Sequence, residues 1–87
     1  MGRTLVIHKL AKKEMRKAYL WYKKRSVIAG ARFREMIDDA MSRIAEDPSI
    51  HQKYLHGLSV YVLKRFPYFI VFWFDDYVIK LVILITS

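Results

Sequence analysis

Apolar residues near the two ends of the chain run without interruption, as they do in buried strands. Residues 3–8 contain Leu5-Val6-Ile7, in which two of three side chains are β-branched, and this predicts a short first strand. β-Branched and aromatic residues also dominate the C-terminal part of the chain. They predict three further strands, at 58–65, 68–74 and 77–85. Phe66-Pro67 separates the first two of these, and Asp75-Asp76 predicts a tight turn between the last two.

Between these strands, apolar residues recur at the spacing of a helix. The pattern predicts one helix over 10–25 and a second over 27–47. The stripe on the first consists of Ala11, Met15, Ala18 and Tyr22, widened by Leu10 and Tyr19. The stripe on the second consists of Ala29, Phe33, Met36, Ile37, Ala40, Met41 and Ile44. Ser26 is expected to cap the second helix, and Asp47 to end it because the residue before a proline avoids the α region.

The predicted order of elements is therefore β-α-α-β-β-β, with residues 48–57 as a loop. The short join between the helices predicts an antiparallel pair. The fold class is α+β, with a two-helix hairpin packed on a small antiparallel sheet. A chain of 87 residues is expected to form one domain, 1–87, with a modest core.

The apolar C-terminal stretch does not predict a membrane helix. A spanning helix needs about 20 continuous apolar residues, and Asp75, Asp76 and Lys80 interrupt the run. The short apolar run near the N-terminus is likewise too brief for a signal peptide.

Both faces of the predicted sheet are apolar. Along 68–74, one face carries Phe69, Val71 and Trp73. The other carries Ile70, Phe72 and Phe74. Since two helices cover only one face, the second face is expected to be covered by a dimer mate or a partner protein. The alternative is that aromatic side chains at the rim fold over the sheet.

The charge is concentrated in the first helix. The chain has 16 basic and 8 acidic residues, a net charge of +8. One acid, Glu14, lies among the basic residues of 9–25: Lys9, Lys12, Lys13, Arg16, Lys17, Lys23, Lys24 and Arg25. Such a helix predicts an anionic partner, either nucleic acid or an acidic protein segment, although a solvated helix face is the alternative.

Few residues point to catalysis. The chain has no cysteine, which excludes disulfides and thiolate sites. The histidines His8, His51 and His56 lack the spacing of a zinc site, and no cofactor or metal is expected. One basic and aromatic group could stabilise a phosphoryl transition state, or could simply be solvent-facing charges on an edge strand. It consists of Lys53, Tyr54, Lys64, Arg65 and Tyr68.

Three segments, in this order, resemble the RelE/ParE toxins of bacterial type II toxin–antitoxin systems. AKKEMRKAYLWY, from Ala11, is similar to the first helix of ParE-type chains, with its A-x-x-[DE]-x-x-x-A-x-x-[WY]-Y pattern. ARFREMIDDAMSRIAEDP is similar to the second helix, which includes Phe33 and ends at Pro48. LKRFPYFIVFWFDDYVIKLVIL is similar to the family's hairpin and closing strand. The resemblance extends over almost the whole chain.

The resemblance implies a cytoplasmic toxin that a cognate antitoxin neutralises through an acidic, amphipathic C-terminal segment. A hetero-oligomer with the antitoxin is expected, and a homodimer is possible for the toxin alone. ParE-like members inhibit DNA gyrase and are not enzymes. RelE-like members cut mRNA in the ribosome with lysines, arginines and a C-terminal tyrosine.

Two features favour the ParE-like activity. RelE-like chains have an arginine after the hairpin tyrosine, whereas Phe69 follows Tyr68 here, and no tyrosine lies beyond Tyr77. The RelE-like alternative would be a metal-independent endoribonuclease. Because the family usually continues with a tail bearing His and Arg, a degenerate toxin that only binds antitoxin is a third possibility.

The resemblance also suggests site residues. For activity it points to Arg65, the counterpart of the family's hairpin arginine, with Lys64 and Tyr68 beside it. Antitoxin binding is expected to use bulky aromatic side chains, because these carry most interface energy. The predicted set is Tyr19, Tyr22, Phe33, Phe72 and Trp73.

Overall fold

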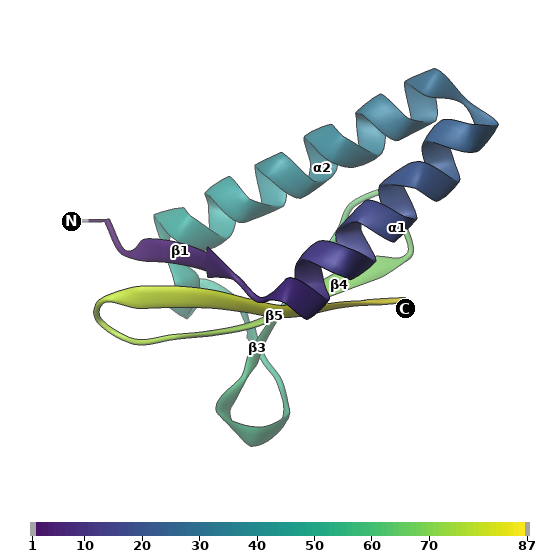
Figure 1. The fold of residues 1–87 in the computed structure, drawn as a ribbon. Coiled ribbons are helices and arrows are strands. Elements are labelled where there is room, and N and C mark those ends of the chain that lie inside the picture. Colours follow the sequence, from purple (N-terminus) through teal and green to yellow (C-terminus); the bar gives the residue numbers. More distant parts are fainter. Residues whose placement is uncertain (1, 87) are drawn as a thin grey trace.

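Two antiparallel helices lie on one face of a five-stranded sheet (Figure 1). The computed structural model describes residues 2–86. Its elements are β1 (Thr4–Ile7), α1 (Lys9–Arg25), α2 (Val27–Glu46), β2 (Gln52–Lys53), β3 (Ser59–Val62), β4 (Tyr68–Phe74) and β5 (Val78–Thr86). Short 3₁₀ turns occur at Pro48–Ile50 and Leu55–Gly57. The predicted α+β class and the helix hairpin are confirmed.

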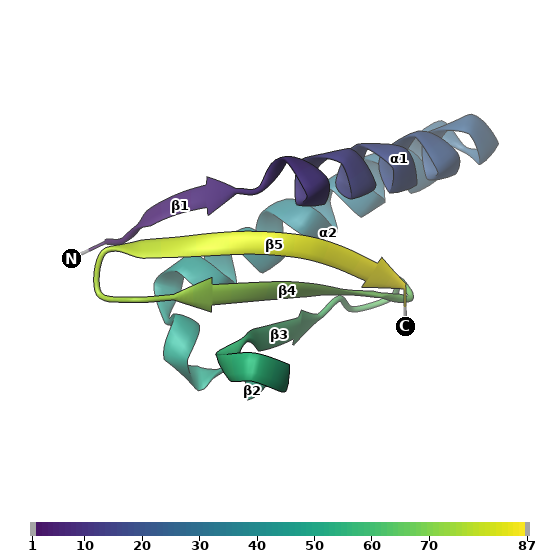
Figure 2. The same cartoon turned by 60° about the horizontal axis from the view of Figure 1, so that its bottom comes forward.

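The sheet is mixed rather than antiparallel throughout. Its strand order is β1-β5-β4-β3-β2. β1 runs parallel to β5, and all other neighbours are antiparallel (Figure 2). A parallel pair needs a crossover connection, which the helix hairpin and the intervening strands provide. The β4–β5 ladder shifts register between Val71 and Phe72, whose partners are Ile83 and Leu81, so Val82 is the extra residue of a β-bulge.

Side chains fix the ends of the helices where the sequence predicts them, to within one residue. The His8 ring Nδ1 accepts from the Leu10 N–H at 3.0 Å, so α1 begins one residue earlier than expected. The Ser26 hydroxyl accepts from the Ala29 N–H at 3.2 Å, which confirms the predicted cap of α2. Asp47 follows the end of α2, and its carboxylate accepts from the Ser49 N–H at 3.1 Å.

The core lies between the helices and the inner face of the sheet. The predicted stripe of α2 supplies Phe33, Ile37, Ala40 and Ile44. The sheet supplies Ile70, Phe72, Ile79, Leu81 and Leu84, and the loop after β3 adds Leu63. From α1 only Ala11 and Ala18 are fully buried, while Leu10 is exposed. Small residues on α1 let this helix lie close to β5.

The second face of the sheet is partly covered by the chain itself. Val71 is 2% exposed and Val60 is 5% exposed, although neither belongs to the main core. The Tyr54 ring lies 5.9 Å from Phe69 at the margin of this face. The chain's own residues thus cover the middle of this face, whereas Trp73 on the same face is 37% exposed, so a partner that covers the rest of the face remains a prediction.

The segment after α2 differs most from the prediction. The expected loop at 48–57 contains the short strand β2, and the strand expected over 58–65 ends at Val62. Beyond it, Arg65 has a φ of 71°, which lies in the left-handed region, so residues 63–67 form a loop rather than a strand. Within residues 2–86 there is no helix with the length and apolar character needed to cross a membrane.

Candidate partner-binding groove and hairpin loop

Four aromatic rings connect the helix hairpin, near its turn, to the start of β4. They belong to Tyr22, Phe33, Phe66 and Tyr68. The Tyr22 ring stacks on Phe33 with centroids 5.3 Å apart, and meets Phe66 edge-on at 5.0 Å. The Phe33 ring lies 5.7 Å from Tyr68. Such pairs contribute about 0.5–1.5 kcal/mol each beyond their buried area. Three residues singled out in the sequence, Tyr22, Phe33 and Tyr68, therefore come together here.

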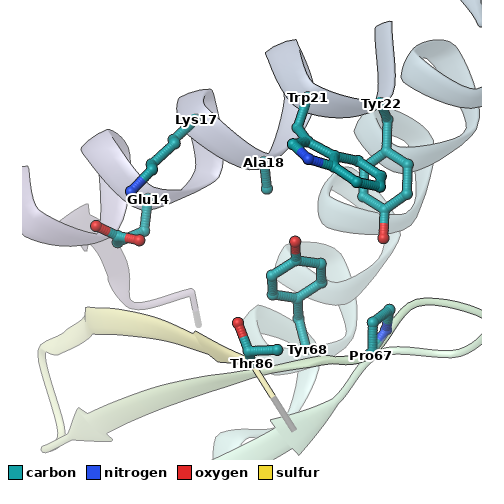
Figure 3. Close-up of a pocket in the computed structure, with 8 residues that line it drawn as sticks. All are labelled: Glu14, Lys17, Ala18, Trp21, Tyr22, Pro67, Tyr68 and Thr86. Carbon is teal, nitrogen blue, oxygen red and sulfur yellow. The ribbon is translucent and has the colours of Figure 1, made fainter. Parts of the chain in front are cut away.

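A groove lies beside this cluster, between α1 and the end of the sheet. Its volume is about 300 Å³. It is lined by Glu14, Lys17, Ala18, Trp21, Tyr22, Pro67, Tyr68 and Thr86. Figure 3 shows the Tyr68 hydroxyl pointing from the sheet toward α1, with the Trp21 and Tyr22 rings above it. The groove thus combines aromatic surface with hydroxyl groups.

The environment of the groove also raises the pKa of one of its two tyrosines, Tyr22. Burial raises the pKa of Tyr22, and the neighbouring Tyr68 hydroxyl adds to the effect through its charge when ionised and through a hydrogen bond. Tyr22 is therefore neutral near pH 7, and its hydroxyl can act as both donor and acceptor.

Within residues 2–86, no cation of α1 forms an ion pair with an acidic side chain. Among residues 2–86 the ion pair is Arg43–Asp39, at 2.9 Å on the exposed side of α2. On α1, the Arg25 guanidinium instead lies 3.4 Å from the Trp21 ring centroid and donates to the Trp21 carbonyl oxygen at 3.0 Å. The positive charge of α1 remains available to an anionic partner.

The five residues predicted to bind an antitoxin differ in how much of their surface is exposed. Tyr19 and Tyr22 are half-buried, and Trp73 is 37% exposed. Phe33 and Phe72 are 1% and 0% exposed, so neither has surface with which the folded chain could contact a partner. For these two the prediction is corrected: their apolar spacing reflects the core.

The three residues proposed for activity do not share a cavity. Arg65 borders a hollow of about 410 Å³ beside Arg32 and Glu35 on α2. Lys64 borders a separate hollow of about 200 Å³ next to Tyr61. Tyr68 points into the groove under α1.

The other two members of the basic and aromatic group lie farther along the sheet. The Lys53 Nζ lies 5.3 Å from the centroid of the Phe74 ring, and Tyr54 packs on Phe69. The cluster that the sequence suggested for phosphoryl-transfer chemistry is therefore not assembled in this structure.

Two of the histidines, His51 and His56, lie in the segment between α2 and β3. The His51 ring lies 5.3 Å from Tyr61 and 5.9 Å from Phe72, both edge-on. His56 lies in the short turn Leu55–Gly57 with a φ of 56°. In the described part of the chain, no three His, Asp or Glu side chains gather where a metal ion could bind.

Several residues that line the groove were not predicted from the sequence. Trp21, Lys17 and Glu14 lie on the face of α1 next to Ala18, and their spacing of three and four residues could have revealed that they share a face. Thr86 lies one residue beyond the predicted end of the last strand, and the sequence pattern gives no signal for its place in the groove.

Comparison with known proteins gives one family and one fold. Residues 5–86 match the model of the family described as "ParE toxin of type II toxin-antitoxin system, parDE". A solved structure, the chromosomal ParDE TA system from P. aeruginosa, superposes with a TM-score of 0.70 at 13% sequence identity. That match covers 98% of this chain and 96% of the other. A search of curated protein sequences gives no match.

Proposed function

This chain belongs to the ParE toxin family of type II toxin–antitoxin systems, and on that premise we propose that it inhibits DNA gyrase and is neutralised by a cognate antitoxin. Membership of a ParDE-type family implies such an antitoxin as partner. The finer assignments concern which residues contact the target and which contact the antitoxin.

The observation that carries the target assignment is the backbone of Arg65. Its φ of 71° costs a residue with a side chain about 1–2 kcal/mol, whereas glycine adopts it freely. Strain of this kind is common at functional sites, and since His56 shares it, the position of Arg65 in the hairpin loop is what distinguishes it. The Arg65 side chain is exposed on the loop between β3 and β4, which is where the family's hairpin arginine is expected. Arg65 thus presents a charge to the target, with Lys64 beside it.

The separation of Lys64, Arg65 and Tyr68 into three hollows weighs against the endoribonuclease alternative. Acid–base catalysis requires groups within hydrogen-bond reach of the same reacting atoms. Inhibition by binding needs only a complementary surface, so the proposed activity is non-enzymatic.

The antitoxin assignment has separate support. The unpaired cations of α1 are complementary to an acidic segment, and the groove beneath them offers aromatic surface at Trp21 and Tyr22. Tyr and Trp are enriched among residues that dominate binding energy. Tyr19 and Trp73 remain the other proposed contacts.

A supercoiling assay tests the target assignment. Purified gyrase and relaxed plasmid are mixed with increasing amounts of the chain, of Arg65→Ala and of Arg34→Ala, which removes the same charge from α2. We expect inhibition by the wild type and by Arg34→Ala but not by Arg65→Ala. Equal inhibition by all three proteins would show that Arg65 does not contribute to gyrase inhibition.

Absence of inhibition at large excess would refute the gyrase proposal. Codon-specific mRNA cleavage in a translation extract would then establish the endoribonuclease alternative. If neither activity is found but antitoxin still binds, the chain is a degenerate toxin.

A further inference from the structure

The turn between α1 and α2, residues 20–28, is a hairpin tip with exposed apolar side chains. In both ribbon views it extends beyond the end of the sheet (Figures 1 and 2). Leu20 and Trp21, near the end of α1, are 44% and 50% exposed. Val27 and Ile28, at the start of α2, are 74% and 64% exposed. Single exposed apolar residues are ordinary, whereas a group of them marks an interaction surface.

The charge around the hairpin tip has one sign. Residues 15–34 contain no acidic residue. Glu14 precedes Trp21 and Glu35 follows Ile28, each by seven residues, which is about 10 Å along the helix. The two acids thus lie back along the hairpin. The basic residues of this stretch are Arg16, Lys17, Lys23, Lys24, Arg25, Arg32 and Arg34.

Cationic and apolar groups lie side by side at the hairpin tip. The Arg25 guanidinium lies 3.4 Å from the centroid of the Trp21 ring. A surface hollow of about 530 Å³ on α1 is lined by three cations and two apolar side chains: Lys17, Lys24, Arg25, Leu20 and Trp21. Lysine and arginine lay their methylene stems along apolar surface while their charged ends stay in water. The apolar side chains can therefore be buried without burial of the charges.

The apolar side chains surround the end of the hairpin rather than form a stripe along it. Leu20 and Trp21 are consecutive on α1, as are Val27 and Ile28 on α2, and consecutive residues of a helix point about 100° apart. A protein segment that binds a helix pair lies along one face and meets side chains spaced three or four residues apart. This arrangement favours insertion of the whole tip into a surface.

Charge and shape together select the partner. Phosphates of a nucleic acid would satisfy the cations but would leave Val27 and Ile28 in water. A second copy of the chain would bring two basic hairpins together, and each chain carries a net charge of +8. An anionic bilayer offers lipid phosphates to the cations and an apolar layer beneath them. Tryptophan is enriched at this boundary.

We propose that the hairpin tip binds the surface of anionic phospholipid bilayers. Leu20, Val27 and Ile28 enter the boundary between headgroups and acyl chains, Trp21 lies at the level of the headgroups, and the surrounding cations contact lipid phosphates. The binding is peripheral, without a spanning segment. This inference goes beyond the proposed function and does not depend on it, because neither gyrase nor an antitoxin takes part.

Tryptophan fluorescence with lipid vesicles tests the inference. The chain has two tryptophans, so Trp73→Phe leaves Trp21 as the reporter. Vesicles of phosphatidylglycerol and phosphatidylcholine in equal parts are compared with vesicles of phosphatidylcholine alone. We expect the Trp21 emission to shift to the blue, and the chain to co-sediment, with the anionic vesicles only. Absence of co-sedimentation with the anionic vesicles would overturn the inference.

Two matched pairs of variants locate the contact. Ile28→Ser should weaken binding to the anionic vesicles about tenfold through lost apolar burial. Ile50→Ser makes the same change at a residue that is 72% exposed on another part of the chain, and should bind as the wild type does. Lys24→Gln should weaken binding about fivefold, and Lys9→Gln, at the opposite end of α1, should weaken it less. All four side chains are exposed, so the variants keep the fold.

The other outcomes contradict the inference in distinguishable ways. If Ile28→Ser binds as tightly as Ile50→Ser and the Trp21 emission does not move, adsorption by net charge alone explains the binding and insertion of the tip is overturned. Binding to a DNA duplex that Lys24→Gln weakens, without binding to vesicles, assigns the cations to nucleic acid instead. A blue shift that grows with the chain's own concentration in the absence of vesicles assigns the tip to a second copy.

Discussion

Replacement of Gly30 by alanine has two opposing effects on stability, because Gly30 lies in close contact with the other helix. Gly30 is buried on α2, opposite Lys23 of α1. A Cβ placed on Gly30 would lie 2.8 Å from the Lys23 Cβ and 2.9 Å from the Lys23 Cα. One of these atoms is backbone, so a rotamer change cannot relieve the overlap and the helices must separate.

The magnitudes predict net destabilisation. Alanine is favoured over glycine in a helix interior by about 1 kcal/mol. Overpacking of a well-packed site costs typically about 1–3 kcal/mol. The difference is a loss of roughly 0–2 kcal/mol in the free energy of unfolding, and each 1 kcal/mol corresponds to a fall in Tm of about 4–8 °C for a domain of this size.

Thermal and urea denaturation of Gly30→Ala measure this difference. Ala31→Gly provides the control, since Ala31 is exposed on the same turn and reports the helix preference alone, with an expected loss of about 1 kcal/mol. Gly30→Ala could instead raise the free energy of unfolding by as much as Ala31→Gly lowers it. That result would show that no steric constraint exists at Gly30 and would contradict the prediction.

Three further perturbations test separate parts of the structure. Phe33→Ala removes the largest buried ring of α2 and should cost about 3–5 kcal/mol by urea denaturation; a loss under 1 kcal/mol would contradict its place in the core. Arg65→Gly should raise stability by about 1 kcal/mol through relief of the left-handed backbone while it abolishes gyrase inhibition, and a loss of stability would show that Arg65 is not strained. The N–H groups of Tyr77 and Val78, each 2.8 Å from the Asp75 carboxylate, hold the pKa of Asp75 below its usual value. The ionised carboxylate therefore contributes stability above its unfolded-state pKa that is lost as the pH falls through the lower folded-state pKa. The stability difference between wild type and Asp75→Asn should shrink over that range in acid denaturation, and a constant difference would refute this.

Much of the fold follows from local signals in the sequence. The apolar stripe of α2, the cap at Ser26 and the turn at Asp75 are consequences of short-range spacing and hydrogen bonding, so the pattern predicts them well. The parallel pairing of β1 with β5 does not follow from local pattern, because it joins the two ends of the chain. The break at Arg65 was missed for a different reason: a non-glycine residue in the left-handed region gives no sequence signal.

The candidate site was only partly predictable. Motif resemblance pointed to Arg65 and Tyr22, but apolar spacing cannot distinguish a core ring such as Phe72 from an exposed ring such as Trp73. That distinction depends on which face of the sheet the helices cover. The groove under α1 depends on the difference in length between two paired strands and on where α1 passes over the longer one, which is a tertiary property.

The most direct test of the account is gyrase supercoiling with the toxin free and with the toxin bound. Relaxed plasmid and gyrase are incubated with the chain alone, and with the chain after preincubation with an excess of its cognate antitoxin. We expect the chain alone to block supercoiling and preincubation to restore it. Supercoiling that proceeds unaffected by a large excess of the free chain would contradict the claim that this protein is a gyrase-directed toxin.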